Sequence, residues 1–277
     1  MFTIIEKKIL NPQMILFRLD APYIARKVLP GQFVILRTDE KGERIPLTVA
    51  DYDREGGWIT IIFQTVGATT QKLAAFTEGQ ALPDVVGPLG KASHFDGCSR
   101  VAVIGGGAGC AIAYPQAKAL FNAGVTVDMI AGFRNKELII LEDEMAAVST
   151  NLFVMTDDGS NGQKGFVTQK LAERTDASAA YDLVVAIGPL PMMRAVCQMT
   201  KEFGIKTIVS MNPIMIDGTG MCGGCRLTVG GETKFACVDG PDFDGHQVDF
   251  EEAMMRSSIY REQEQHSCNL LAKEFER

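Results

Sequence analysis

The stretch Arg100–Cys110, RVAVIGGGAGC, decides the fold of this chain. Its apolar run is typical of a buried strand, and the glycines that end the run are typical of a turn into a helix. A helix is predicted over 114–122, where apolar residues follow helical spacing until Gly124 stops it. We therefore expect a strand, turn and helix here, the repeating unit of a parallel α/β sheet.

Strand and helix patterns continue to alternate after this unit. Strands are predicted at 125–131, 151–156, 181–187 and 206–210, and helices at 142–149, 168–174 and 191–203. Such alternation predicts a doubly wound parallel α/β sheet. We assign residues 98–210 to this nucleotide-binding α/β domain.

The residues before this unit have a different pattern. Short runs rich in β-branched and aromatic residues occur at 3–10, 14–19, 32–37, 47–50 and 58–64. Turn residues such as Asn11-Pro12 and Gly56-Gly57 separate these runs, as in an antiparallel barrel or sandwich. We predict a small antiparallel β-barrel over residues 1–97.

The C-terminal part, residues 211–277, is distinguished by the run DGTGMCGGCRLTVGGETKFAC at 217–237. A plant-type [2Fe–2S] site has the spacing CxxxxCxxC and a distant fourth cysteine. Here Asp217 takes the first position, and Cys222, Cys225 and Cys237 take the others. The spacing predicts an electron-transferring cluster with one oxygen ligand. Residues 211–245 are too rich in glycine for regular elements to be expected, and 249–277 is predicted to be a terminal helix.

Other interpretations of this run remain open. A CxxC turn also occurs in zinc sites, although His246 and Cys268 lie at no familiar zinc spacing. Asp217 precedes a glycine and could be only a turn former, in which case Cys268 is the main rival for the fourth ligand.

Three segments of the α/β domain are candidates for nucleotide binding. The glycines within 105–109 lie between strand and helix, where small residues let a diphosphate approach the backbone. Asp157 and Asp158 follow a later strand, where carboxylates would accept hydrogen bonds from a ribose and repel a 2′-phosphate, so NAD is favoured over NADP. The segment AIGPLPMM (186–193) has a turn that suits a nicotinamide. The alternatives are an ordinary glycine turn and a solvated acidic turn.

The barrel contains two segments that could hold a flavin diphosphate. RIPLT (44–48) offers a cation and a hydroxyl group, and GATT (67–70) supplies donors at the start of a short helix. Without a family for comparison, both segments are also consistent with ordinary edge-strand and turn chemistry.

Composition narrows the class of protein. The net charge of −7 and the pI near 5.1 argue against a nucleic-acid footprint. Apolar residues make up 46% of the chain, yet no stretch approaches the roughly 18–20 apolar residues that a membrane span needs, and no apolar signal segment follows Met1. We expect a soluble, cytoplasmic protein without membrane or nucleic-acid partners. Seven cysteines, three of them clustered, indicate a metal site in a reducing compartment.

The order of barrel, nucleotide half and cysteine run resembles the ferredoxin–NADP reductase-type flavoproteins that carry a C-terminal [2Fe–2S] lobe. This resemblance covers nearly the whole chain and implies a Greek-key barrel. Within the group, the segments DGTGMCGGC and FACVDGPDFDGH are similar to the small subunits of NADH-dependent reduced ferredoxin:NADP oxidoreductases. The electron transfer subunits of dihydroorotate dehydrogenases have four cysteines in this run. One departure from relatives is Ile112, which stands where a proline is usual.

The resemblance implies residues for three cofactors. FAD would be bound by Arg44, Pro46, Leu47, Thr48, Gly67, Thr69 and Thr70. NAD(H) would be bound by Gly106, Gly107, Asp157, Asp158, Gly188, Pro189 and Met192. The [2Fe–2S] cluster would be held by Asp217, Cys222, Cys225 and Cys237.

The resemblance also implies a function. NADH and FAD exchange a hydride, and the cluster passes single electrons to or from a larger subunit of a heterodimer. That subunit holds a second FAD and [4Fe–4S] clusters, where electrons from NADPH are bifurcated to ferredoxin and NAD. No side chain is required as an acid or base, so no catalytic residue is predicted. The alternatives are the electron transfer subunit of an NAD-dependent dihydroorotate dehydrogenase and a non-enzymatic, zinc-binding structural subunit.

Overall fold

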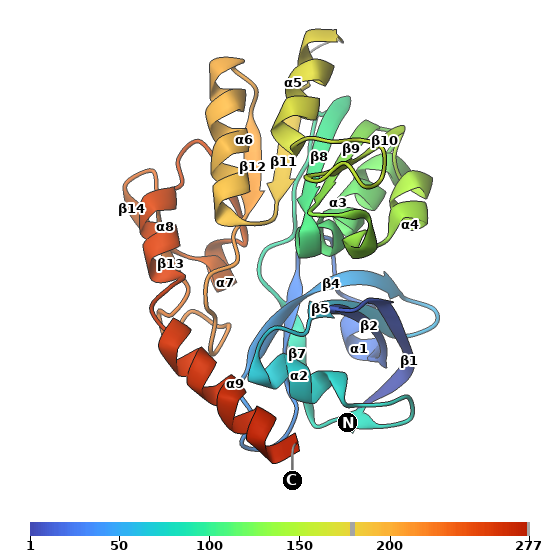
Figure 1. Cartoon of the computed structure of the whole chain (residues 1–277), viewed down its shortest axis with the longest axis vertical. Coiled ribbons are helices and arrows are strands. Elements are labelled where there is room, and N and C mark those ends of the chain that lie inside the picture. Colours follow the sequence, from blue (N-terminus) through green and yellow to red (C-terminus); the bar gives the residue numbers. More distant parts are fainter. Residues whose placement is uncertain (178–180, 276–277) are drawn as a thin grey trace.

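The N-terminal part forms an antiparallel sheet that curls into a nearly closed barrel (Figure 1). The computed structural model describes residues 1–177 and 181–275. The strand order is β6-β1-β2-β5-β4-β3-β7, with β2 beside β5, so the predicted Greek-key barrel is confirmed. Its elements are β1 (Phe2–Asn11), β2 (Met14–Asp20), α1 (Pro22–Ala25), β3 (Phe33–Arg37), β4 (Ile45–Asp53), β5 (Trp58–Gln64), α2 (Ala68–Ala74), β6 (Ala81–Leu82) and β7 (Asp84–Leu89).

Alternating side chains of neighbouring strands fill the barrel. Phe17 and Leu19 of β2 and Ile59 and Ile61 of β5 are fully buried in one core, whereas Arg18, between the two on β2, is only partly buried. Burying each such side chain stabilises the fold by about 1.5–3 kcal/mol. The period of two residues that predicts these strands is therefore the period with which side chains enter the core.

The second sheet has the order β10-β9-β8-β11-β12-β15, and its first five strands are parallel. This is the predicted doubly wound arrangement, in which strand order reverses between β8 and β11. The strands are β8 (Arg100–Gly106), β9 (Thr126–Phe133), β10 (Asn151–Thr156), β11 (Leu183–Ile187), β12 (Thr207–Ser210) and β15 (Asp242–Asp244). The helices are η1 (Gly107–Gly109), α3 (Cys110–Asn122), η2 (Lys136–Leu138), α4 (Glu142–Ala147), α5 (Val167–Ala177) and α6 (Leu190–Glu202).

Helices cover both faces of this sheet (Figure 1). Buried residues of α3 and α4 share one core with one face of the strands, and buried residues of α5 and α6 share a second core with the other. Helix α3 begins at Cys110, earlier than predicted, because the glycine turn passes directly into it. The amino end of α3 therefore stands at the carboxyl end of β8, next to the point where strand order reverses.

The C-terminal part contains more regular structure than its glycine content suggests, so the expectation of none over 211–245 is wrong. Its elements are β13 (Arg226–Val229), β14 (Glu232–Phe235), α7 (Ala236–Asp239), β15, α8 (Phe250–Arg256) and α9 (Arg261–Phe275). Gly230 and Gly231 both have positive φ, at 61° and 79°, and form the tight turn between β13 and β14. Glycine here supports a hairpin instead of preventing one.

The predicted terminal helix is divided in two. Helices α8 and α9 are separated at Ser257–Tyr260, and α9 runs back across the molecule to lie against α2 of the barrel (Figure 1). Strand β15 pairs antiparallel with β12, so the C-terminal part also adds an edge strand to the nucleotide sheet. The domain limits at 97 and 210 stay predictions. Across residues 1–177 and 181–275, none of the helices has the length and apolar character to cross a membrane.

A buried carboxylate stabilises the end of the nucleotide sheet where its parallel strands begin. Asp128 on β9 accepts hydrogen bonds from Tyr181 Oη at 2.6 Å and Asn151 Nδ2 at 2.7 Å. Arg100 and Arg174 each bring a guanidinium nitrogen to it, at 3.0 and 3.3 Å. Burial by itself raises the Asp128 pKa, but these hydrogen bonds and charges outweigh it, so the pKa lies below its ordinary value.

Candidate functional site

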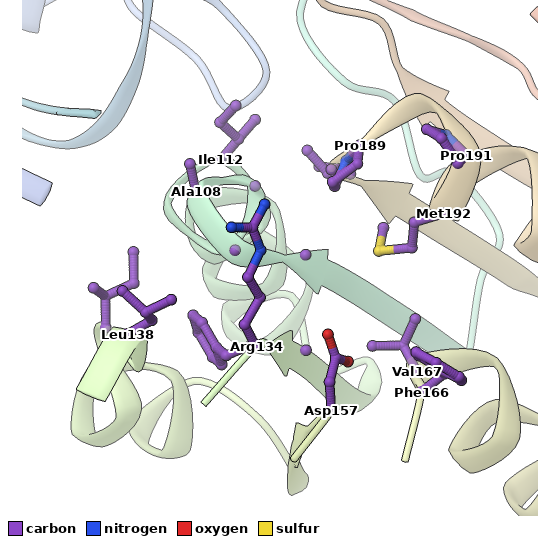
Figure 2. A pocket seen from close by; sticks show the side chains of 18 of the residues that line it. Ala108, Ile112, Arg134, Leu138, Asp157, Phe166, Val167, Pro189, Pro191 and Met192 are labelled. Carbon is purple, nitrogen blue, oxygen red and sulfur yellow. The ribbon is translucent and has the colours of Figure 1, made fainter. Parts of the chain in front are cut away.

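A cavity of about 750 Å³ lies where the carboxyl ends of the parallel strands face the barrel (Figure 2). The turns after β8 and β11 form one side of it, and the ends of β9 and β10 form another. The barrel contributes Asn11, Gln13 and Met14 from the β1–β2 turn and Gln64 from the end of β5. Ligands of doubly wound sheets bind at this position, outside the carboxyl ends of the strands at the reversal of strand order.

The two turns that flank this reversal are closely packed, and position 109 accepts only glycine without movement of the backbone. A Cβ atom at Gly109 would lie 2.3 Å from the Ile187 carbonyl oxygen. A Cβ atom at Gly188 would lie 3.1 Å from the Gly106 backbone. Gly107 is different, since its φ is +55° and no atom of the described residues lies within 4 Å of a Cβ there. The turns therefore hold each other in place while Gly107 leaves open space beside the amino end of α3, where a diphosphate would be favoured.

Six of the seven predicted nucleotide residues line this cavity. They are Gly106, Gly107, Asp157, Gly188, Pro189 and Met192. The seventh, Asp158, is not among the lining residues, and its carboxylate instead accepts a hydrogen bond from the Ser160 backbone N–H at 2.9 Å. Interactions with the Ser160 side chain, and then with its backbone, lower the Asp158 pKa. The structure thus places Asp157 alone at the position where a ribose carboxylate partner was predicted.

Sequence reasoning missed Arg134, which immediately follows β9 and lines the cavity. Figure 2 shows Arg134 and Asp157 extending into the cavity from neighbouring strand ends. The Arg134 side chain is exposed and is in none of the ion pairs formed by the described residues. A usable signal existed in the sequence, because a cation directly after a parallel strand lies at the ligand-binding edge of the sheet.

The structure brings the two predicted flavin segments together. Thr69, on α2, donates its hydroxyl hydrogen to Glu43 Oε2 at 2.6 Å, and Glu43 directly precedes Arg44. Pro46, Leu47 and Thr48 pair with β3 in the adjacent strand β4. At the start of α2, the Gly67 backbone N–H donates to Thr70 Oγ1 at 3.0 Å. Glu43 was not predicted, and no local sequence pattern identifies it.

These residues are compatible with a diphosphate. Arg44 is exposed and joins no ion pair within the described part of the chain, so its guanidinium is available to an anion. Thr69 is buried, and its hydroxyl would exchange the Glu43 carboxylate for a phosphate oxygen. The donors expected of an FAD-diphosphate site are therefore present on two adjoining segments.

The β13–β14 hairpin explains how two of the predicted cluster cysteines meet. Cys225 precedes β13 and Cys237 follows β14, so pairing of the two strands brings their ends together. Their Sγ atoms lie 3.2 Å apart, and both cysteines are buried and free. Burial raises the pKa of Cys237 to about 12, and its contact with Cys225 adds to this effect. Two soft sulfur donors at one buried point suit an iron–sulfur cluster.

Asp217 and Cys222 lie in the same loop but do not converge with this pair. The Asp217 carboxylate accepts backbone hydrogen bonds from Thr219 and Cys222, each at 2.8 Å, and the bond from Thr219 is the main cause of its lowered pKa. Cys222 is exposed. Within residues 1–177 and 181–275, no group of three or more His, Cys, Asp or Glu side chains is gathered in a metal-binding arrangement. Cluster binding would require the short 217–222 loop to turn its side chains inward.

The rival metal ligands lie elsewhere. Cys268 is on α9, with its Sγ 4.0 Å from the Val66 carbonyl oxygen of the barrel. His246 Nε2 lies 3.0 Å from Thr200 Oγ1 on α6. Neither residue is placed with Cys225 and Cys237, so the fold gives no support to a zinc site that uses them.

Two family models match the chain. Residues 103–198 match the oxidoreductase NAD-binding domain. Residues 212–249 match the iron–sulfur cluster binding domain of dihydroorotate dehydrogenase B. The matches fall on the doubly wound sheet and on the hairpin with its cysteines.

Relatives extend the similarity over the whole chain. A Thermotoga maritima protein described as a homolog of the dihydroorotate dehydrogenase B (NAD(+)) electron transfer subunit is 46% identical over 257 residues, covering 93% of this chain and 90% of its own. A Geobacillus electron transfer subunit of dihydroorotate dehydrogenase B is 31% identical over 255 residues, covering 89% of this chain and 96% of its own. The solved structure of an NADH-dependent reduced ferredoxin-NADP oxidoreductase contains a chain that superimposes with a TM-score of 0.93 at 43% identity, over 98% of each chain. The chain belongs to the ferredoxin reductase-type oxidoreductase family that includes the electron transfer subunits of dihydroorotate dehydrogenase B and their homologues.

Proposed function

We propose that this chain is the electron-transfer subunit of an electron-bifurcating, NADH-dependent ferredoxin:NADP oxidoreductase. It binds NAD(H), FAD and a [2Fe–2S] cluster, and works with a larger subunit. When bound, these groups supply the chemistry, which is hydride exchange between nicotinamide and flavin and single-electron transfer by the cluster. The protein's own residues bind the cofactors, orient them and exclude water.

The observation that carries this proposal is the cavity between the nucleotide sheet and the barrel. Its walls come from both parts of the molecule, so a nucleotide held on the glycine turns would face the barrel. The Gly188-Pro189 turn and Met192 lie on the wall nearest the reversal of strand order. A site built from two facing walls restricts how a nicotinamide can be presented, which is the main contribution a protein makes to hydride exchange.

Residues at the far side of the cavity support NAD over NADP. Asp157 can accept hydrogen bonds from a ribose, and its negative charge opposes a 2′-phosphate. Arg134 lies close by and carries the opposite charge. We assign Arg134 to binding of the diphosphate, which NAD and NADP have in common, so it does not discriminate between them. The preference for NAD therefore rests on Asp157, and Asp158 is not needed for it.

The cluster would be held by Cys222, Cys225, Cys237 and Asp217. The buried Cys225 and Cys237 supply two converging sulfurs, and Cys222 stands on an exposed turn in the same lobe. Burial favours the protonated thiol of Cys237, whereas a cluster ligand must be a thiolate, so cluster binding would release this proton. An exposed ligand turn is the expected place for electrons to leave toward a partner.

The partner is proposed to be a larger subunit with a second FAD and [4Fe–4S] clusters, in a heterodimer through which NADP(H) and ferredoxin react. Similarity to electron transfer subunits supports the existence of a larger partner. The full-length superposition with the ferredoxin-NADP oxidoreductase chain, at 43% identity, supports this kind of partner.

The second candidate is the electron transfer subunit of an NAD-dependent dihydroorotate dehydrogenase. The family-model match at residues 212–249 favours it, because the model describes that enzyme's cluster domain. Asp217 argues against it, since the resemblance implies cysteine at that position in such subunits.

Spectroscopy of the full-length protein, purified under anaerobic conditions, tests the proposal. We expect flavin bands together with broad cluster absorption, and bleaching of both by NADH at concentrations at least tenfold below those needed with NADPH. A colourless protein that contains zinc would refute it. Mass spectrometry of the subunit that co-purifies from the native source distinguishes the two candidates: a flavin and [4Fe–4S] protein supports bifurcation, and a dihydroorotate-oxidising subunit refutes it.

A further inference from the structure

Asp242 lies where the three parts of the molecule meet. It is the first residue of β15, within the FACVDGPDFDGH segment, and pairs with Ser210 at the end of β12. Ser93, on the connection that follows the barrel, donates a hydrogen bond to Asp242 Oδ2. Gln116, on α3, donates to the same oxygen through Nε2 at 3.4 Å. One carboxyl group therefore contacts the barrel connection, the nucleotide-binding helix and the edge of the nucleotide sheet.

Two oxygens at this junction have no hydrogen-bond donor among residues 1–177 and 181–275. Asp242 Oδ1 is buried and has no partner, and Gln116 Oε1, on a side chain that is 0% exposed, also has none. Both oxygens are acceptors if Asp242 is ionised, so neither can satisfy the other. Buried acceptors without donors are rare in folded proteins because their lost hydration is not replaced. A single hydrogen shared between these two oxygens would remove both defects, since a protonated carboxyl can donate to an amide oxygen.

We propose that Asp242 is protonated in the folded protein at neutral pH and shares its proton with Gln116. The acid and the amide then form a reciprocal pair, in which Gln116 Nε2 donates to one carboxyl oxygen and the other carboxyl oxygen donates to Gln116 Oε1. Asp242 is thus a positioning residue, because it holds the cluster-bearing part of the chain against α3.

The surroundings favour the neutral form. Burial raises the pKa of Asp242, and the polar side chains of Ser93, Ser210 and Gln116 only partly oppose this rise. All three of these neighbours are uncharged, so within the described part of the chain no cation opposes protonation of the carboxyl group.

The charged groups on the elements packed around Asp242 are engaged with other partners or are exposed. On α3, Lys118 pairs with Asp51 of the barrel at 2.7 Å. On β15, Asp244 accepts hydrogen bonds from the His246 backbone and from Gln247. On the barrel connection, Lys91 is exposed. None of these groups is among the hydrogen-bonding or charged influences on Asp242.

This arrangement matters for electron transfer, a step of the inference that rests on the proposed function. The amino end of α3 faces the nucleotide, and β15 leads from the cysteine-bearing loop. The Asp242–Gln116 pair therefore fixes the cluster lobe relative to the nucleotide. Ionisation of Asp242 would place an unpaired charge at this junction and loosen it, so cluster reduction by NADH should slow as pH rises.

Infrared spectroscopy of the full-length protein tests the proton directly. A protonated carboxyl has a C=O stretching band, separate from the amide bands, that a carboxylate lacks. We expect the difference between wild type and Asp242→Asn at pH 7 to contain this band, shifted in D₂O. Asp244→Asn is the matched control, because it removes an exposed carboxyl two residues away on the same strand, and it should leave the band intact. A wild-type spectrum without a band that depends on Asp242 would overturn the proposal.

A second variant tests the role of Gln116. Gln116→Leu should shift the carboxyl band, because the acid loses its acceptor, and an unchanged band would refute the reciprocal pair. In holoprotein, cluster reduction by NADH should fall with rising pH in wild type and become independent of pH in Asp242→Asn, whose amide cannot ionise. Equal pH profiles would refute the positioning role. The infrared result does not require flavin or cluster, so it stands or fails separately from the proposed function.

Discussion

Gly109 offers a direct test of how the nucleotide site is assembled. In Gly109→Ala, the added methyl group would lie 2.3 Å from the Ile187 carbonyl oxygen and 2.8 Å from Gly188 Cα. Both obstructing atoms belong to the backbone, so no side-chain rotation relieves the contact. The amino end of α3 and the carboxyl end of β11 must move apart by roughly 1 Å to reach ordinary contact distances. Overpacking of this kind costs about 1–3 kcal/mol, and we expect the upper half of that range.

The same displacement separates the two turns that flank the cavity. A misplacement of about 1 Å at a reacting or binding group can reduce function by about 100-fold, so we expect NADH to bind about 10 to 100 times more weakly. Urea unfolding measures the loss of stability, and titration with NADH measures the loss of affinity.

Gly124→Ala is the matched control at the other end of α3. Its φ of +81° makes a side chain unfavourable, but none of the structurally described atoms lies within 4 Å of the added Cβ. Only backbone strain of about 1–2 kcal/mol is therefore expected, and NADH binding should not change. If the free energy of unfolding of Gly109→Ala is within about 0.5 kcal/mol of the wild-type value and NADH binds normally, the close packing of the two turns described above is incorrect.

Three further predictions concern other parts of the molecule. Asp128→Asn should lower the free energy of unfolding at pH 7 by about 3 kcal/mol, since it leaves two partly buried guanidinium groups unpaired. The Asp128 pKa is lower in the folded protein than in the unfolded chain, so this difference in stability should be complete above the pKa of the unfolded chain. It should shrink as the pH falls through the pKa of the folded protein, and urea unfolding at a series of acidic pH values would show this. Lys118→Met breaks a half-exposed ion pair with Asp51 and should cost less than about 1 kcal/mol without changing NADH affinity; a larger loss in calorimetry would contradict this estimate. Asp217→Cys should change the EPR signal and redox potential of the cluster, and an unchanged signal and potential would show that Asp217 is not a ligand.

The doubly wound sheet could be predicted because buried parallel strands and their following helices have strong local patterns. RVAVIGGGAGC contains both a fully buried strand and the turn that ends it, and the observed β8 and η1 coincide with them. The start of α3 was placed four residues too late, since the short apolar residues after Gly109 fit either a strand or a helix. Local pattern therefore identifies the element and leaves its boundary open.

The hairpin of the C-terminal part was missed for a different reason. Averaged over 211–245, the glycine content predicts irregular structure, but Gly230 and Gly231 are concentrated at one turn where positive φ is required. The flanking residues 226–229 and 232–235 are free to pair. The positions of glycines along the chain, and not their number, decide whether they support or prevent regular structure.

Glu43 and Asp242 could not be assigned from local sequence because their roles depend on distant residues. Glu43 meets Thr69 only after the barrel closes, and Asp242 meets Ser93 and Gln116 only when all three parts are packed. Asp158 shows the opposite case: its neighbour Asp157 has the same charge and nearly the same position, yet the turn at Ser160 engages only Asp158. Sequence patterns predict which segments meet a ligand more readily than which side chain does.

The pairing of β15 with β12 limits how this protein can be divided or recombined. A truncation at residue 210 would leave β12 as an uncovered sheet edge, and exposed edges promote aggregation by pairing with other chains. For the same reason, a cluster-binding segment from a relative could not be exchanged as an independent cassette at that point. A working chimera would have to carry the donor's β12 together with its β15, so evolution is expected to have kept the two strands as one inherited unit.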